Sequence, residues 1–427
     1  MITYAELTEA RQRVAPVLRP TPVDHSGSLS ALVQRPVLLK PEYRQRTGSF
    51  KIRGAYNHIA QLPPGVTVVA ASAGNHAQGV ALAAALTGRS AIIFMPRGAA
   101  LPKIEATKGY GAEVRLVGEV VDEAIAEARA TASATGAAYV HPFDDRAVIA
   151  GQGTIGLELI DEAPEAEVVV VPVGGGGLLS GVAAAMALGR PQVRVIGVEA
   201  AGAPTLSAAL AAGRPVALDR LATMADGIAV GACSELTLRH AQAYVDAVVT
   251  VDEEEISQTM LLLLERSKAV VEPAAATALA AILAGRVPGR GPAVAVLSGG
   301  NIDPLLLTKL IEHGLSVAGR YLVLRFVMTD RPGALADLTA KLAALRLNVL
   351  DVEHHRSGMG LGVDQVEVAV TLETRNTAHH HEVLDTLRAA GYDVTAIAGG
   401  SISSGPPIGI DRMAGPADRR RSDRRRR

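Results

Sequence analysis

Cysteine and large aromatic residues are scarce in this sequence. Its 427 residues include one cysteine, Cys233, no tryptophan and four phenylalanines. A single cysteine excludes a disulfide framework and fits a reducing compartment. No apolar run reaches the roughly eighteen residues of a membrane-spanning helix, and residues 1–4 lack the pattern that opens a secretory signal. We therefore expect a cytoplasmic protein without a membrane partner, whose core is built from Val, Leu, Ile and Ala.

A dominant charge of either sign is also absent. Lys and Arg number 42 against 43 Asp and Glu, so the net charge is −1, and 48% of the residues are hydrophobic. This balance argues against a nucleic-acid partner. The basic block is the end of the chain, where residues 400–427 are rich in Ser, Gly, Pro and Arg and are predicted to be disordered. A basic arm that binds nucleic acid is the alternative to a solvated extension.

Strand and helix patterns alternate through residues 67–297. Residues 167–173 form a near-continuous valine run, which is typical of a parallel strand buried on both faces. Strands separated by helices of about ten to fifteen residues predict a doubly wound α/β architecture with parallel sheets. Ligands of such sheets bind beyond the carboxyl ends of the strands. The polar loops at 72–76, 174–177 and 298–301 all follow predicted strands, so we expect the functional site there.

The pattern changes after Gly319 and Arg320. Residues 321–399 show the order strand, helix, strand, strand, helix, strand, which is the ferredoxin-like βαββαβ unit. The whole chain is long enough for several domains. We expect a catalytic region at 1–318, in which a small domain at about 48–150 is inserted into a large one, and a separate unit at 319–399.

Lys51 is the first candidate catalytic residue. It stands between Phe50 and the apolar helical positions Ile52, Ala55 and Ile59. A lysine in such surroundings loses hydration, which lowers its pKa, and a neutral amine can condense with an aldehyde. The alternative is an ordinary lysine at a helix start with its amine in solvent.

A run of four glycines is the second candidate feature. Gly174, Gly175, Gly176 and Gly177 follow a buried strand and open a helix, so their N–H groups are expected to hold a phosphate. The spacing matches neither the nucleoside-triphosphate nor the dinucleotide motif. A loop that serves only as a tight turn is the alternative.

Two further loops carry polar side chains. Ser72 and the free N–H groups of the following helix start suit a carboxylate, and Asn75 suits a phenolic oxygen. Ordinary capping of that helix by Ser72 or Asn75 is the alternative. Ser298 stands at a strand end, where it could meet a ring nitrogen or serve as a turn residue before two glycines.

Taken together, these loops resemble the pyridoxal-phosphate enzymes of the tryptophan-synthase-β fold, called fold type II. They resemble the threonine dehydratases, or threonine ammonia-lyases, more closely. The resemblance covers about residues 5–315 and is carried by residues 48–51, 72–79, 141–145, 150–154, 174–178, 225–230 and 298–301. Residues 321–399 resemble an ACT domain, a small amino-acid-sensing module.

The resemblance implies pyridoxal 5'-phosphate as the cofactor and a role for each motif. Lys51 would bind the cofactor covalently and later act as acid and base at the substrate Cα. The glycine loop with Leu178 would hold the phosphate, and the ring would lie near Phe50, Asn75 and Ser298. The neutral Ser298 hydroxyl would leave the ring nitrogen unprotonated, which suits β-elimination. The substrate carboxylate would meet the loop made by Ser72, Ala73, Gly74 and His76, where His76 is expected to be packed beside the site.

The implied reaction is deamination of L-threonine to 2-oxobutanoate and ammonia by elimination of water, with L-serine giving pyruvate. The alternatives are a dehydratase of L-serine or 3-hydroxyaspartate, a serine racemase, and an amino-acid-sensing protein without chemistry. Ala73 disfavours the racemase, because racemases of this fold carry a second serine there. Lys51 disfavours the pure sensor. Ala275 stands where glycine is common in the family, so the shape of the pocket is left open.

The ACT-like region implies regulation by an amino acid. A turn at Gly333, with Arg331 and Leu335, is expected to dock an effector carboxylate, and Asn348 to hold the amine. A purely structural dimerisation domain is the alternative, and isoleucine, valine or no effector all stay open. His379–His381 are expected to be surface residues and no metal site is expected. The family suggests a homotetramer or a homodimer.

Overall fold

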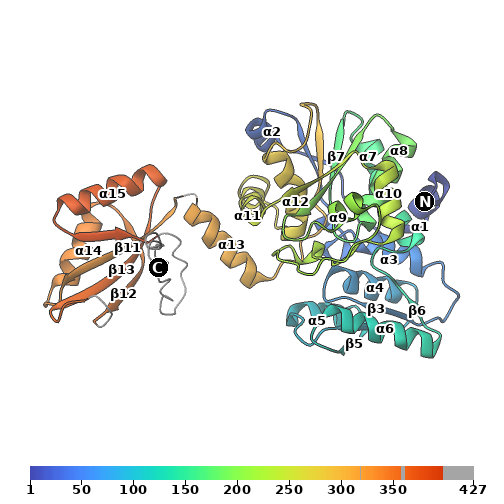
Figure 1. Cartoon of the computed structure of the whole chain (residues 1–427), viewed down its shortest axis with the longest axis horizontal. Coiled ribbons are helices and arrows are strands. Elements are labelled where there is room, and N and C mark those ends of the chain that lie inside the picture. Colours follow the sequence, from blue (N-terminus) through green and yellow to red (C-terminus); the bar gives the residue numbers. More distant parts are fainter. Residues whose placement is uncertain (318, 357–360, 398–427) are drawn as a thin grey trace, which may run out of the picture. The chain divides into compact units, whose positions relative to one another are not determined.

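The structure is a computed structural model that describes residues 1–317, 319–356 and 361–397 (Figure 1). It divides into two compact units, Met1–Gly314 and a second that begins at Leu315. The arginine-rich tail for which disorder is predicted lies outside the described residues. Within those residues no helix is long and apolar enough to cross a membrane.

The larger sheet of the first unit has six strands in the order β1-β2-β10-β7-β8-β9. Every neighbouring pair is parallel except β1 with β2 at one edge. The strands are β1 (Asp24–His25), β2 (Val37–Lys40), β7 (Val168–Pro172), β8 (Arg194–Ala200), β9 (Ala247–Val251) and β10 (Ala293–Val296). β7 and β10 are buried at every position because helices cover both faces of the sheet.

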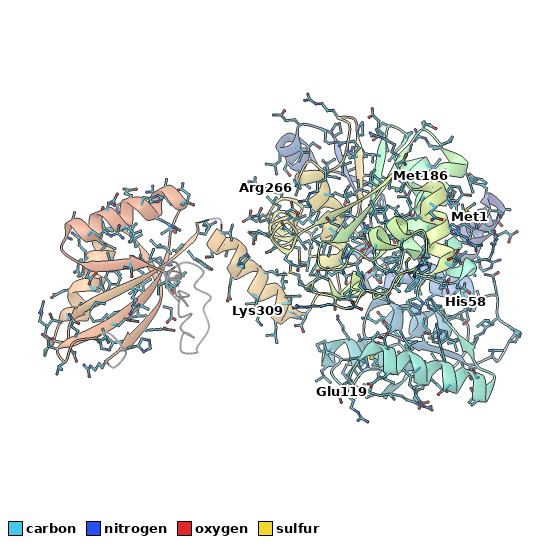
Figure 2. All side chains as sticks on the ribbon, viewed as in Figure 1. Met1, His58, Glu119, Met186, Arg266 and Lys309 are labelled. Carbon is cyan, nitrogen blue, oxygen red and sulfur yellow. The ribbon has the colours of Figure 1, made fainter. Side chains whose placement is uncertain are left out.

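Helices pack on both faces of this sheet. The helices on the sheet, or on the helices that cover it, are α1 (Tyr4–Val14), α2 (Gly27–Val33), α7 (Arg146–Glu162), α8 (Gly177–Gly189), α9 (Thr205–Ala212), α10 (Glu235–Tyr244), α11 (Glu253–Leu262) and α12 (Pro273–Leu283). The last helix of the first unit, α13 (Pro304–Val317), continues past Gly314 into the second unit. Met186 of α8, labelled in Figure 2, belongs to the apolar core on one face, and Ala278 of α12 to the core on the other.

A smaller, wholly parallel sheet has the order β5-β4-β3-β6. Its strands are β3 (Val68–Ala71), β4 (Ala91–Met95), β5 (Glu113–Leu116) and β6 (Ala138–Tyr139), and its helices are α3 (Lys51–Ile59), α4 (Asn75–Leu86), α5 (Leu101–Gly109) and α6 (Val121–Thr135). Two helix-covered sheets, the smaller wholly parallel and the larger parallel except at one edge, confirm the predicted α/β class.

The second unit is one antiparallel sheet in the order β12-β13-β11-β14, with two helices. Along the chain it runs β11 (Tyr321–Thr329), α14 (Ala334–Ala344), β12 (Asn348–His355), β13 (Gln365–Glu373), α15 (Thr377–Ala389) and β14 (Asp393–Ala396). Phe326 and Val368 of the sheet pack with Leu338 and Leu387 of the helices. This is the predicted ferredoxin-like βαββαβ unit.

Candidate active site

Lys51 is the first residue of α3, and the loop before it is joined to the loop after β10. The Phe50 N–H donates to the Ser298 carbonyl at 3.1 Å, and the Gly300 N–H donates to the Gly48 carbonyl at 2.9 Å. Gly48 has a φ of +68°, and a Cβ there would run into the Asn301 side chain. Only glycine meets both conditions, so the close approach of the two loops requires it.

The Lys51 amine lies in surroundings that favour its neutral form. Burial lowers the pKa of Lys51 to about 8, and the nearby Glu272 carboxyl opposes this shift. Its Nζ donates to the Pro142 carbonyl at 3.3 Å and lies 5.1 Å from the centre of the Phe50 ring. These contacts favour a desolvated amine over a lysine head in solvent.

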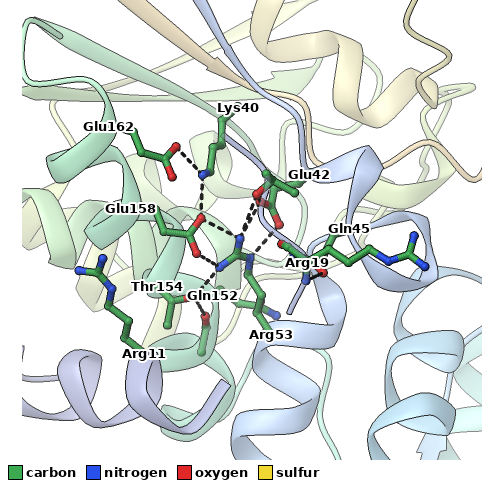
Figure 3. A network of polar contacts seen from close by, with 12 residues as sticks. Arg11, Arg19, Lys40, Glu42, Gln45, Arg53, Gln152, Thr154, Glu158 and Glu162 are labelled. Atoms are coloured by element: carbon green, nitrogen blue, oxygen red, sulfur yellow. Dashed lines mark hydrogen bonds and ion pairs between the residues drawn. The ribbon is translucent and has the colours of Figure 1, made fainter. Parts of the chain in front are cut away.

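Arg53, two residues further along α3, is fully buried and fixes this helix to the large sheet (Figure 3). Its guanidinium pairs with Glu42, Nε to Oε2 2.8 Å, and with Glu158 of α7, Nη1 to Oε1 2.6 Å. The buried Lys40 of β2 also pairs with Glu158, Nζ to Oε2 2.7 Å. The helix that begins with Lys51 is therefore held by ion pairs as well as by apolar packing.

The four-glycine loop joins β7 to α8. Gly176 precedes the helix with a φ of +88°, and no side chain caps the helix N-terminus. A Cβ at Gly174 would lie 2.9 Å from Ile228 Cα, and one at Gly177 would lie 2.8 Å from Phe143 Cβ. Because the walls leave no room for side chains, the loop presents bare backbone N–H groups, which suit a phosphate.

α4 also begins without a side-chain cap. Gly74 occupies the capping position, and the Ser72 hydroxyl accepts a hydrogen bond from the Gly74 N–H at 3.1 Å instead. Capping of this helix by Ser72 or Asn75, the alternative considered above, therefore does not occur. The N–H groups of its first turn stay available for a carboxylate.

Asn75 lies beside Gly299, the residue after Ser298, since a Cβ at Gly299 would lie 3.1 Å from Asn75 Nδ2. Two residues without an assigned role hydrogen-bond to Asn75. Asn75 Nδ2 donates to Glu272 Oε1 at 2.7 Å, and Asn301 Nδ2 donates to Asn75 Oδ1 at 2.8 Å. Ser298 is 4% exposed. The sequence patterns gave neither Glu272 nor Asn301 a function, although Asn301 stands in the 298–301 motif and Glu272 lies three residues before Ala275.

The surroundings of His76 do not suit a positively charged side chain that would bind the substrate. It is buried, and its Nε2 lies 2.8 Å from the Val140 carbonyl, to which a neutral ring can donate. Burial, followed by the charge of Lys51, lowers the pKa of His76 to about 3. Its contact is with the backbone after β6, as expected for a histidine packed beside the site.

The effector residues expected in the second unit do not all come together. Gly333, with a φ of +90°, and Arg331 follow the end of β11. Asn348 lies opposite Glu373, which pairs with Tyr321 at the start of β11. The two ends of the nine-residue strand β11 are about 25 Å apart, since a strand rises by about 3.3 Å per residue. Asn348 therefore cannot share one site with Arg331 and Gly333 within a single copy.

The first unit has partners for two functional groups of pyridoxal phosphate, the aldehyde and the phosphate. Lys51 offers an amine of lowered pKa to an aldehyde, and the uncapped start of α8 offers N–H groups to a phosphate. Each lies at a helix start directly after a loop that follows a parallel strand, where ligands of such sheets bind.

Comparisons with known proteins agree with this fit. Residues 14–299 match the family described as "Pyridoxal-phosphate dependent enzyme", and residues 322–379 match "ACT domain". An L-threonine ammonia-lyase of Thermotoga maritima is 46% identical over 93% of this chain and all of its own length, and one of Geobacter sulfurreducens is 44% identical over the same shares. A crystal structure of threonine deaminase from T.th. is similar with a TM-score of 0.68 and 41% identity, covering 71% of this chain and 99% of its own. The chain therefore belongs to the pyridoxal-phosphate-dependent enzymes, in the group that includes the L-threonine ammonia-lyases, and carries an ACT domain.

Proposed function

We propose that this enzyme deaminates L-threonine to 2-oxobutanoate and ammonia, and also converts L-serine to pyruvate. The observation that carries the proposal is the Lys51 amine, which is desolvated to a pKa of about 8 and lies in the same site as the two uncapped helix starts. The relatives named as L-threonine ammonia-lyases support the choice of substrate.

Each side chain or helix start has one task in this reaction. The first turn of α8 holds the phosphate, and the first turn of α4, with Ser72, binds the substrate carboxylate. When bound, the cofactor supplies a ring that withdraws electrons from the substrate Cα. The neutral Lys51 amine takes the Cα proton. The β-hydroxyl then leaves, so that the Cα proton and the hydroxyl group are lost overall as one water. The unsaturated amine that is released takes up one water and gives the 2-oxo acid and ammonia.

A racemase is less well supported by the residues present. Ala73, next to Ser72, has no proton to deliver to the opposite face of Cα. A maize serine racemase is nevertheless similar in fold, with a TM-score of 0.69 and 35% identity. Product analysis has to distinguish the two reactions.

The test is release of 2-oxo acid by purified protein supplied with pyridoxal phosphate. We expect L-threonine to be used faster than L-serine or L-threo-3-hydroxyaspartate, and no D-serine to form from L-serine. No oxo acid from any of the three substrates, with the cofactor bound, would contradict the proposed reaction while leaving the family unchanged.

We further propose that an amino acid binds the second unit beside Arg331 and Gly333. A hollow of about 400 Å³ there is lined by residues that include Arg331, Asp337, Gln365 and Tyr392. Arg331 Nη2 lies 2.8 Å from Asp337 Oδ2. A zwitterion carries both charges that this pair can bind. We propose that Asn348 is not part of this site within one copy.

We also propose that the enzyme is cytoplasmic and forms a homotetramer or a homodimer. The buried Cys233 then stays reduced.

A further inference from the structure

The carboxyl group of Glu272 lies inside the site and does not cap the helix that begins at the next residue. α12 begins at the next residue, and the Glu272 side chain makes no capping hydrogen bond to it. Its backbone carbonyl accepts from Ala275 N–H at 3.0 Å, so the backbone of Glu272 bonds to the helix while the side chain does not. The side chain is 5% exposed and points to Asn75 instead.

The surrounding chain leaves room for this carboxyl group. A Cβ at Gly299 would collide with Glu272 Oε1, and one at Gly227 would lie 3.5 Å from the same atom. No Lys or Arg of the described residues forms a salt bridge with Glu272. A buried carboxyl group without such a partner is unfavourable for folding, and groups of this kind concentrate at functional sites.

Glu272 and Asn301 together fix the orientation of the Asn75 amide. Asn301 Nδ2 donates to the Thr47 carbonyl at 2.6 Å and to Asn75 Oδ1 at 2.8 Å. Asn75 Oδ1 must therefore face Asn301, since a reversed amide would set two donors against each other. Asn75 Nδ2 then faces Glu272 Oε1 at 2.7 Å, and its second N–H is left for another partner.

We propose that Glu272 is a positioning residue of this active site: it holds the Asn75 amide toward the cofactor and carries an exchangeable proton beside Lys51. The inference rests on the proposed cofactor site and adds to it a group that exchanges a proton in the physiological range. An ordinary helix-start glutamate would do neither.

The charges around Glu272 support proton exchange near neutral pH. Burial, followed by the charge of the Asp226 carboxylate, raises the pKa of Glu272 to about 7. The hydrogen bond from Asn75 and the charges of Lys103 and Lys51 act in the opposite direction. Asp226 lies in the short helix η3 (Asp226–Ile228), and its Oδ2 is 2.6 Å from Lys103 Nζ of α5.

The test is a pH titration of the absorption spectrum of the full-length holoenzyme. The wild-type spectrum is expected to change with one ionisation near pH 7, which Glu272→Gln should abolish because the amide cannot ionise. Asp226→Asn removes a negative charge and should move the midpoint to lower pH, whereas Lys103→Met should move it to higher pH. Asp226 is 63% exposed on its side chain, so its variant is expected to fold.

Cofactor affinity tests the positioning role separately. Glu272→Ala leaves Asn75 Nδ2 without its acceptor and should weaken pyridoxal-phosphate binding by roughly 10-fold. Glu272→Gln keeps an acceptor oxygen and should restore affinity to near the wild-type value. The matched control is Glu199→Gln, which changes a buried carboxyl group with a raised pKa that hydrogen-bonds to Leu206 and Ser207 rather than to Asn75. It should leave the midpoint of the titration unchanged.

Two results would overturn the inference. One is a Glu272→Gln holoenzyme that titrates like the wild type, and the other is a folded Glu272→Ala protein with wild-type cofactor affinity. Failure of the proposed function would look different, since the wild-type protein itself would then bind no cofactor or release no oxo acid.

Discussion

At the scale of single residues, the site depends on groups held in states that water would not favour. Lys51 is the clearest case, because its pKa is lowered from 10.5 to about 8 by burial. An amine that keeps its proton poorly is useful as a base and unfavourable for folding at neutral pH. Function and stability therefore make opposite demands at this position.

Replacing Lys51 with methionine should abolish turnover and stabilise the cofactor-free protein. The folded-state pKa lies below the unfolded one, so unfolding takes up a proton between about pH 8 and 10.5, and wild-type stability rises with pH through that window. Lys51→Met has no such charge. At pH 7 it should be more stable by up to about 3 kcal/mol, since each pKa unit corresponds to about 1.4 kcal/mol.

Urea denaturation at pH 7 and again at about pH 11.5, above the unfolded-state pKa of the amine, measures this difference. The gain should shrink at the higher pH, where the wild-type amine is neutral in both states. A gain that is the same at both pH values would show that packing, rather than desolvation of the charge, is responsible.

The glycine loop makes a second prediction at this scale. Gly174→Ala would push the Ile228 backbone, which lies 2.9 Å from the new Cβ, and shift the N–H groups of the loop. We expect pyridoxal-phosphate affinity to fall roughly 10-fold, about the loss of one charge-assisted hydrogen bond. The control is Gly109→Ala at the end of α5, where no atom lies within 4 Å of the new Cβ. Equal affinities for the two variants would contradict the packed loop.

At the scale of elements, α3 is held by the buried network around Arg53. Glu42 and Arg53 are both fully buried, and the Arg53 guanidinium donates two hydrogen bonds to the Glu42 carboxylate and two to the Glu158 carboxylate. Removing one member leaves charges without partners in a medium that solvates them poorly. The arrangement constrains where α3 lies, and hence where Lys51 lies, because a displaced helix would separate these buried charges.

Arg53→Met should lower the free energy of unfolding by about 3–5 kcal/mol, the usual result of breaking a buried ion pair. Denaturant titration of the full chain measures the change. The control is Arg239→Met, which removes an exposed pair with Glu235 four residues away and should cost less than about 1 kcal/mol. Similar losses for the two variants would show that the buried network contributes no more than a surface pair.

At the scale of the whole molecule, the chain joins a catalytic unit to an ACT domain. The second unit has its own core and an open hollow beside Arg331 and Asp337. Binding there can change catalysis only if the effector prefers one state of the enzyme over another. The response to amino acids is therefore the property that shows whether the units are coupled.

Asp337→Asn should weaken the response of threonine deamination to an effector, measured with L-isoleucine and L-valine. Loss of the carboxylate removes the partner of the effector's ammonium group, so the half-maximal concentration should rise roughly 10-fold. Glu382→Gln, an exposed charge on α15, should leave that concentration unchanged. A wild-type enzyme that responds to neither amino acid would favour a purely structural ACT unit.

Much of this architecture follows from local patterns along the chain. The strands β3, β7 and β10 are runs of Val and Ala, and the glycine loop after β7 carries its backbone freedom in its sequence. These features can be predicted because strand pattern and glycine conformation depend on neighbouring residues. The βαββαβ order of the second unit follows for the same reason.

Tertiary structure decided what depends on partners far along the chain. β2 was not predicted as a strand, since it ends in Lys40, whose charge is buried only because Glu158 and Glu162 of α7 pair with it. The role proposed for Glu272 depends on its hydrogen bond with Asn75, which is 197 residues away in the sequence. Asn348 is not in the expected site because the strand register places it at the end of the sheet opposite to Arg331 and Gly333. Spacing in sequence cannot reveal such contacts, because the desolvation and charge balance that create them arise only once the sheets and helices have packed.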